Sequence, residues 1–218
     1  MPKYTPKNKA KLKNLIKNNK IYLGDIDTRK ITDMSKLFFA SNRKDFSGIE
    51  SWDTSNVKNM RAMFFGCSDF NQNISNWNVS KVRNMAFMFM WCNNFNQPLD
   101  AWDVSNVCNM SNMFYGCMNF NQNISNWNVK NVRYMNFMFC GCHSFNQPLD
   151  TWDVSNACDM SFMLANCYNF EQSLYEWKIP IKTITNNMLL NCDKIKDFPA
   201  DWIESFEELR SGELCEKL

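Results

Sequence analysis

Hydrophobic and polar residues alternate over a short stretch, and this pattern is repeated along most of the chain. In residues 99–105, LDAWDVS, the apolar Trp102 and Val104 alternate with Asp103 and Ser105. A period of two places the apolar pair on one face of an extended chain and the polar pair on the other. The pattern predicts a short, half-buried β-strand.

The residues that follow change to a spacing of three to four. The apolar positions of this second stretch are Val107, Met110, Met113, Phe114 and Cys117. This spacing is typical of one face of a helix, and Ser105 or Asn106 precedes it as a candidate N-cap. Glycine, the usual residue just beyond a helix, ends the stretch in three copies, at Gly66, Gly116 and Gly141. We therefore predict a short helix after each strand.

Both elements recur every 25 residues. Tryptophan keeps this interval at Trp52, Trp77, Trp102, Trp127, Trp152, Trp177 and Trp202. Cysteine does the same at Cys67, Cys92, Cys117, Cys142, Cys167 and Cys192. The sequence FNQNISNWNV occurs identically at residues 70–79 and 120–129, so a second period of 50 overlies the first. The chain is a tandem array of repeats.

A strand, a short helix and a turn within 25 residues form one coil of a solenoid, because such a unit buries its apolar side only by stacking on its neighbours. We predict an α/β repeat fold, a right-handed solenoid like the leucine-rich repeats, of about seven coils. Short parallel strands would line one face and short helices the other. The predicted domains are an N-terminal helical cap (1–24), the tandem repeats (25–198) and a C-terminal helical cap (199–218).

Composition restricts the function classes and the compartment. With 24 basic and 22 acidic residues, the chain as a whole gives no argument for nucleic acid, although lysines crowd into the first 20 residues. No apolar run approaches the ~20 residues that span a bilayer, so we expect no transmembrane segment. The N-terminus lacks the apolar core of a signal peptide. If Met1 is the native start, we expect a cytoplasmic protein with reduced cysteines.

The cysteine column has a structural and a chemical interpretation. An interval of 25 places each sulfur in a different coil, whereas metal sites need ligands in clusters such as C-x₂-C. We expect no metal and no cofactor, and interpret Cys67, Cys92, Cys117 and Cys142 as a structural ladder of buried thiols. Neighbouring coils ~4.8 Å apart would also permit disulfides in an oxidising compartment, and this alternative stays open.

The tryptophan column could form a sugar-binding platform or part of the core. If the indoles pointed outward, the carboxylate of Asp103 and its equivalents would be buried, at a cost of several kcal/mol each. We therefore predict that the tryptophans point inward and form a second structural ladder. Its central members are Trp77, Trp102, Trp127 and Trp152. Carbohydrate binding remains a less favoured alternative.

Catalysis finds little support in the sequence. His143 is the single histidine, and the chain has no glycine-rich phosphate loop, nucleophile elbow or metal triad. We therefore expect no enzyme. A further group of aromatic residues lies one position before the inward methionines or near them: Phe87, Phe137, Phe162 and Trp91. They would form either an exposed partner site or a half-buried packing layer.

The repeat resembles that of a known family. WDVSNVCNMSNMFYGCMNFNQ, at Trp102–Gln122, resembles the repeat of the BspA-like leucine-rich-repeat surface proteins of host-associated bacteria. The resemblance covers residues 25–195. It implies a leucine-rich-repeat solenoid that is secreted or exposed on the cell surface, and some members of the family adhere to host proteins.

The resulting prediction is a non-enzymatic, protein-binding repeat protein, with adhesion or host-protein interaction through the strand-lined face. The candidate binding residues on that face are Asp53, Asn78, Asp103, Asn128, Asp153, Ser80, Ser105 and Lys130. By the resemblance, the partner would be a host extracellular protein. The alternative is a cytoplasmic interaction module that recruits a protein partner through the aromatic residues or the lysine-rich N-terminus.

Overall fold

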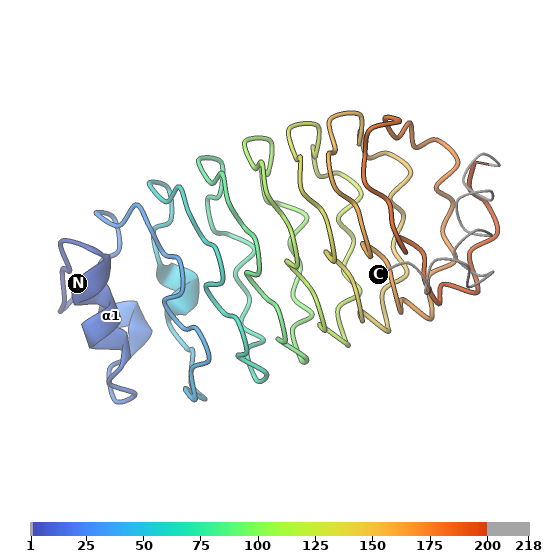
Figure 1. The fold of residues 1–218 in the computed structure, drawn as a ribbon. Coiled ribbons are helices and arrows are strands. Elements are labelled where there is room, and N and C mark those ends of the chain that lie inside the picture. The colour runs from blue at the N-terminus through green and yellow to red at the C-terminus, as the bar shows by residue number, and fades with distance from the viewer. Residues whose placement is uncertain (1, 200–218) are drawn as a thin grey trace, which may run out of the picture.

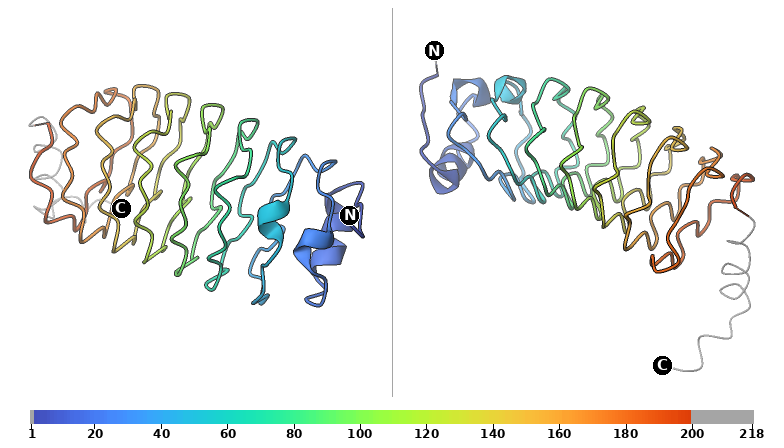
Figure 2. Two further views of the ribbon diagram at one scale, coloured as in Figure 1. Left: turned by 180° about the vertical axis from the view of Figure 1, so that it is seen from behind. Right: turned by 90° about the horizontal axis from the view of Figure 1, so that it is seen from above.

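In the computed structural model, which describes residues 2–199, the chain forms a stack of coils (Figure 1). Successive coils lie side by side along a rod that begins at the helix α1 (Lys9–Ile16). The rod curves gently, and the 3₁₀ turn η2 (Ile49–Ser51) lies on the outer side of the curve (Figure 2). Each 25-residue repeat therefore supplies one layer of the rod.

The N-terminal end of the rod is covered by α1, within the predicted cap 1–24. The side chain of Asn8 caps the helix by accepting a 3.0 Å hydrogen bond from the amide of Lys11, and Leu12 and Ile16 are buried. A 3₁₀ turn, η1 (Leu23–Asp25), leads into the first coil. The predicted C-terminal cap, 199–218, lies outside the described residues apart from residue 199. No helix between residues 2 and 199 is long and apolar enough to cross a membrane.

Parallel backbone pairing joins the coils along one side of the rod. Bridges connect Asp33, Asn59, Asn84, Asn109, Tyr134, Asp159 and Ile184 in succession. Between two coils the amides of alternate residues donate to the next coil, as Met60 does to the carbonyl oxygen of Asn84 at 2.9 Å and Ala62 to that of Ala86 at 2.8 Å. We call residues 58–66, 83–91, 108–116, 133–141 and 158–166 the ladder segments, and their exposed side the ladder face.

The ladder segments are where we predicted helices, and the structure differs there. In the described chain the repeats contain no α-helix; each stretch forms two successive four-residue turns. Met113 donates to the carbonyl oxygen of Met110 at 3.1 Å and Cys117 to that of Phe114 at 2.9 Å. The third residues, Asn112 and Gly116, have φ values of 58° and 71°, as type II turns require. Two four-residue turns in sequence repeat their apolar residues every three to four positions, which the pattern cannot distinguish from a helix.

The predicted strand also has a different structure. Residues 99–107 form turns, in which Trp102 donates to the carbonyl oxygen of Leu99 at 3.1 Å and Val107 to that of Val104 at 2.9 Å. The inter-coil backbone ladder therefore does not run through this part of the repeat. We call the exposed side of residues 51–55 and their equivalents 25, 50, 75 and 100 positions later the turn edge.

Stacked side chains fill the interior. Phe89, Phe114 and Phe139 stack with centroid separations of 5.6 and 5.7 Å. The indoles of Trp102 and Trp127, which lie next to the turn edge, are 6.5 Å apart. The coils are therefore more widely spaced towards the turn edge, which places the ladder face on the inner side of the curve in Figure 2.

Candidate functional site

The predicted binding residues lie on the turn edge and not on a strand. Asp53, Asp103 and Asn128 are exposed, but each side chain accepts a hydrogen bond from the backbone amide two residues later. Their Oδ1 atoms accept from the amides of Ser55 (2.9 Å), Ser105 (3.0 Å) and Lys130 (3.2 Å), respectively. Asn78 and Asp153 accept in the same way from Ser80 and Ser155 at 3.1 Å. These Asx turns need only an Oδ1 acceptor, which explains why Asp and Asn alternate at this position.

The charge of these carboxylates follows from the same contacts. Hydrogen bonds from the hydroxyl and amide of Ser55 hold the pKa of Asp53 below its usual value. Ser155 and the nearby Lys130 do the same for Asp153. Both carboxylates are therefore ionised near neutral pH and already engaged in a turn.

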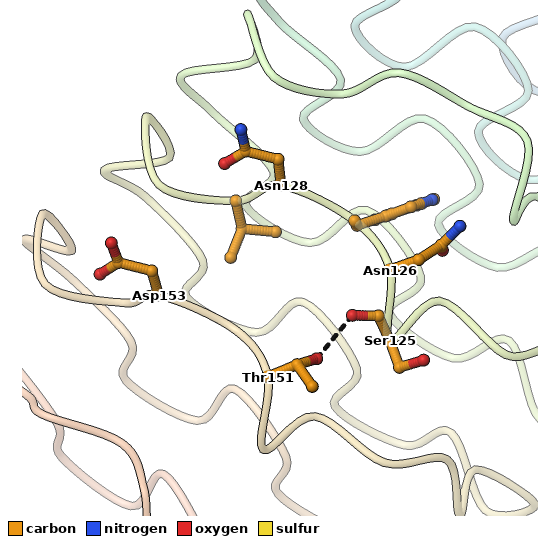
Figure 3. A pocket seen from close by; sticks show the side chains of 7 residues that line it. Ser125, Asn126, Asn128, Thr151 and Asp153 are labelled. Carbon is orange, nitrogen blue, oxygen red and sulfur yellow. Dashed lines mark hydrogen bonds between the residues drawn. The ribbon is translucent and has the colours of Figure 1, made fainter.

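The structure brings two of the candidates, Asn128 and Asp153, together around a shallow hollow between two coils. Figure 3 shows Asn128 and Asp153 extending from neighbouring coils, with Thr151 donating a 2.6 Å hydrogen bond to the carbonyl oxygen of Ser125 below them. The Nζ atom of Lys130 lies 3.6 Å from Asp153. Within residues 2–199, no three His, Cys, Asp or Glu side chains are close enough to hold a metal ion.

The tryptophan ladder lies in the core. The indoles of Trp77, Trp102, Trp127 and Trp152 are 3% exposed. Their Nε1 atoms donate hydrogen bonds of 3.0–3.1 Å to carbonyl oxygens of the preceding coil. Trp102, for example, binds the carbonyl oxygen of Ile74. These indoles tie consecutive coils together and offer no open ring face to a sugar.

The cysteine ladder is built in the same way. Cys67, Cys92, Cys117 and Cys142 are buried free thiols. Each donates to a carbonyl oxygen of the preceding coil at 2.9–3.0 Å. Burial raises the pKa of the Cys67 thiol to about 11, which keeps the donating proton in place at neutral pH. The described cysteines carry no disulfide, and Cys108 and Cys158 are the two that are exposed.

The ladder face carries a continuous aromatic surface. We define the aromatic strip as Phe87, Trp91, Tyr115, Phe137 and Phe162. Trp91 lies edge-on to Tyr115 at 4.9 Å, Tyr115 lies 6.1 Å from Phe137, and Phe137 stacks on Phe162 at 4.7 Å. Trp91 is 40% exposed and the others are half-buried. The strip thus crosses four consecutive coils.

Four of the five strip residues adopt a backbone conformation that bulky side chains avoid. Phe87, Trp91, Phe137 and Phe162 have φ values of 62°, 63°, 57° and 55°. In the other coils most of these turn positions hold residues that tolerate the left-handed region: Gly66, Gly116, Gly141, Asn112, Asn166, Asn187 and Asn191. The exceptions are Lys36, Ala40 and Ala62 in the first two coils. Sequence reasoning named these aromatics only as an alternative site. The signal that could have found Trp91 is an aromatic residue in a column that otherwise holds glycine and asparagine at positions 66, 116, 141, 166 and 191.

No curated protein and no solved structure matches the chain. A family model described as "Mycoplasma protein of unknown function, DUF285" matches residues 9–107 and, a second time, residues 92–202. The two matches together span most of the sequence, from α1 through the last described coil. The chain therefore belongs to the DUF285 family.

Proposed function

We propose that this chain is a non-enzymatic, protein-binding repeat protein, a rod like the leucine-rich-repeat solenoids, that holds its partner on the aromatic strip of the ladder face. The observation that carries the proposal is the left-handed backbone of four of the five strip residues, Phe87, Trp91, Phe137 and Phe162. A non-glycine residue in this region costs about 1–2 kcal/mol. Trp91 is 40% exposed and the other three rings are half-buried, so burial offsets this cost less than it would in the core.

Residues that adopt the left-handed conformation with less strain occupy the same positions in another coil. Asn112 and Gly116 occupy both turn positions of the coil that lies between those of Trp91 and Phe137, and the stack of coils continues through them without interruption. The fold therefore does not need aromatic residues there. Strain that stability does not explain is typical of functional positions, which supports a binding role for the strip.

The other candidate surfaces have a structural explanation. The polar residues of the turn edge close Asx turns, and the stacked tryptophans bind backbone carbonyls inside the rod. The aromatic strip has neither role. An exposed apolar surface on the inner side of a curved repeat protein is the usual form of a protein-binding site.

The resemblance to BspA-like surface proteins supports a host extracellular protein as the partner and the cell surface as the location. Protease treatment of intact source cells tests the location. Degradation of the native protein, with a cytoplasmic marker left intact, is expected for a surface protein. Protection of the protein until the cells are lysed would leave the cytoplasmic interaction module as the function.

The function itself is tested by affinity capture with matched variants. Immobilised wild type, Phe137→Asn/Phe162→Asn and Asp103→Asn/Asp153→Asn would be exposed to host plasma and matrix proteins, and the bound proteins identified by mass spectrometry. We expect proteins that bind wild type and the turn-edge variant and are lost with the strip variant. Capture that is the same for all three, or that is lost only with the turn-edge variant, contradicts the proposal.

A further inference from the structure

We infer that the ladder face recognises an acidic polypeptide segment that also carries apolar side chains. This inference rests on the proposed function and names the chemistry of the partner. It combines the charge of the ladder face with the orientation of the rings in the aromatic strip.

The ladder face is basic along its middle. Residues 58–66, 83–91, 108–116 and 133–141 contain the cations Lys58, Arg61, Arg83 and Arg133 and no aspartate or glutamate. Acids occur only in the flanking coils, where Asp33 pairs with Lys9 and Asp159 accepts from Ser161 at 2.9 Å. Three of these four segments therefore carry cations, and residues 108–116 between them carry no charge.

These four cations have no acidic partner among residues 2–199. Five other basic side chains of the described chain do form ion pairs with aspartates: Lys3, Lys9, Arg29, Lys44 and Lys130. Arg61 instead covers the ring of Phe87, with Cζ 4.8 Å from the centroid. The cations of the ladder face are thus available for carboxylates from outside the chain.

The cations form a row along one edge of the ladder face. The amide of Arg83 donates to the carbonyl oxygen of Lys58 at 3.0 Å, and Cys108 and Arg133 continue the same bonding at 2.9 Å. Arg83 and Arg133 are therefore two coils apart, about 10 Å by strand spacing. The row runs in the direction of the aromatic strip, so an elongated segment could contact both together.

Several ring faces of the aromatic strip are already covered by neighbouring side chains. Phe137 and Phe162 stack at an interplanar angle of 5°, and Phe87 is covered by Arg61. A nucleic acid would need open ring faces on which its bases stack. Ring edges carry partial positive charge and make good contacts with carboxylates and apolar groups. The geometry therefore favours an acidic polypeptide over a single-stranded nucleic acid.

Fluorescence anisotropy at low ionic strength with full-length protein tests the inference. The acidic probe is a labelled peptide of five Asp-Glu-Leu-Phe units; the comparison probes are a peptide of five Lys-Lys-Leu-Phe units and a 20-nucleotide oligo-dT. We expect the acidic peptide to bind most tightly and its affinity to fall as salt is added. Arg83→Glu/Arg133→Glu is expected to weaken binding about tenfold or more. The matched control Lys81→Glu/Lys178→Glu makes the same charge change on exposed side chains outside the ladder segments and is expected to stay within about twofold.

Several results would overturn the inference. Equal or tighter binding of the basic peptide or of oligo-dT would assign the face to another partner class. If Arg83→Glu/Arg133→Glu leaves the affinity for the acidic peptide unchanged, the peptide binds elsewhere on the protein. Concentration-dependent self-association in sedimentation, lost with the same reversal, would make a second copy of the chain the occupant. If the acidic peptide fails while capture of host proteins still depends on Phe137 and Phe162, the proposed function stands and only the partner chemistry is wrong.

Discussion

The indole of Trp91 lies directly against the backbone of Gly116 in the following coil. A Cβ atom at Gly116 would lie 2.5 Å from Cε3 of Trp91, so no other residue leaves room for the ring. Gly116 also has a φ of 71°, and the ring of its neighbour Tyr115 completes the contact at 4.9 Å. Gly116, which lies in a ladder segment, therefore leaves the space that the ring of Trp91 occupies.

Gly116→Ala tests this support. The change introduces a methyl group into the Trp91 ring in addition to left-handed strain, and we expect a loss of about 2–4 kcal/mol in the free energy of unfolding. Gly141→Ala is the matched control, because its φ is 74° but its Cβ would meet only Gly116 Cα at 3.7 Å. Urea denaturation should give the control a loss of about 1 kcal/mol.

The same pair allows a double-mutant cycle. In a Trp91→Ala background, Gly116→Ala is expected to cost no more than Gly141→Ala does, because the clashing ring is gone. An undiminished cost in that background would show that the methyl group meets something other than Trp91.

Phe137→Asn/Phe162→Asn tests the claim that the strip is not required for stability. Asparagine tolerates the left-handed conformation, which offsets the loss of the two half-buried rings. We expect unfolding free energy within about 1 kcal/mol of wild type. Phe139→Ala, which removes a ring that is 0% exposed, should cost about 3–5 kcal/mol in the same denaturation experiment. A strip variant as damaged as Phe139→Ala would mean that the aromatics are part of the core.

Two tryptophans should behave oppositely on truncation. Trp102 is 3% exposed and bonded to the carbonyl oxygen of Ile74, so Trp102→Ala is expected to cost about 3–5 kcal/mol. Trp91 is exposed and strained, and Trp91→Ala should change stability by about 1 kcal/mol or less. Thermal unfolding followed by circular dichroism distinguishes the two. Similar losses for both would contradict the assignment of Trp91 to the surface.

How much of this could be predicted from the sequence depends on the level of structure. The 25-residue interval from Trp52 to Trp202 indicated stacked coils, and the alternation around Trp102 correctly placed the indoles away from Asp103. The backbone within each coil could not be predicted in the same way. The spacing of Met110, Met113, Phe114 and Cys117 fits consecutive four-residue turns as well as a helix. What decides between them is inter-coil hydrogen bonding, as from Met110 to Tyr134, which local sequence does not report.

The buried thiols predict a loss of stability at high pH. Burial raises the pKa of Cys67 to about 11 and that of Cys192 to about 12, above the ordinary value of 9.0. The folded chain therefore holds these protons more tightly than the unfolded chain. The associated stability is complete below pH 9.0 and declines above it, until the pH reaches the folded-state value of about 11 for Cys67. The decline approaches about 1.4 kcal/mol per pH unit for each thiol.

Unfolding free energies measured between about pH 8 and pH 10.5 check this prediction. Cys67→Ala/Cys192→Ala should show a shallower decline than wild type, since other titrating groups are common to both proteins. Parallel curves would indicate that these thiols are not protonated donors in the folded coil.

The turn edge should tolerate loss of charge but not loss of its acceptor. Asp103→Asn keeps the Oδ1 atom that binds the amide of Ser105, and we expect stability within about 0.5 kcal/mol of wild type. Asp103→Ala removes the acceptor and should cost about 1 kcal/mol. The unfolding free energies of both variants, measured by chemical denaturation, separate the role of the charge from that of the Oδ1 acceptor. A larger loss for the asparagine variant would show that the charge itself matters at this position.

The candidate site shows the same limit of sequence reasoning. Asp103 and Asn128 drew attention as polar residues on a predicted strand, but a sequence cannot show that their oxygens bind backbone amides two residues later. The sequence places Phe137 and Phe162 one position before the inward methionines, as either an exposed partner site or a half-buried packing layer. Their left-handed conformation becomes visible only when the turns of the ladder are known, and that conformation distinguishes them from core residues.

The most direct test of the central claim is the dissociation constant of one captured host protein, measured for three proteins under identical conditions. We predict that Phe137→Asn/Phe162→Asn weakens binding about tenfold or more, while Asp103→Asn/Asp153→Asn stays within about twofold of wild type. Wild-type affinity in the strip variant, with its fold intact, would contradict the assignment of the ladder face as the binding surface.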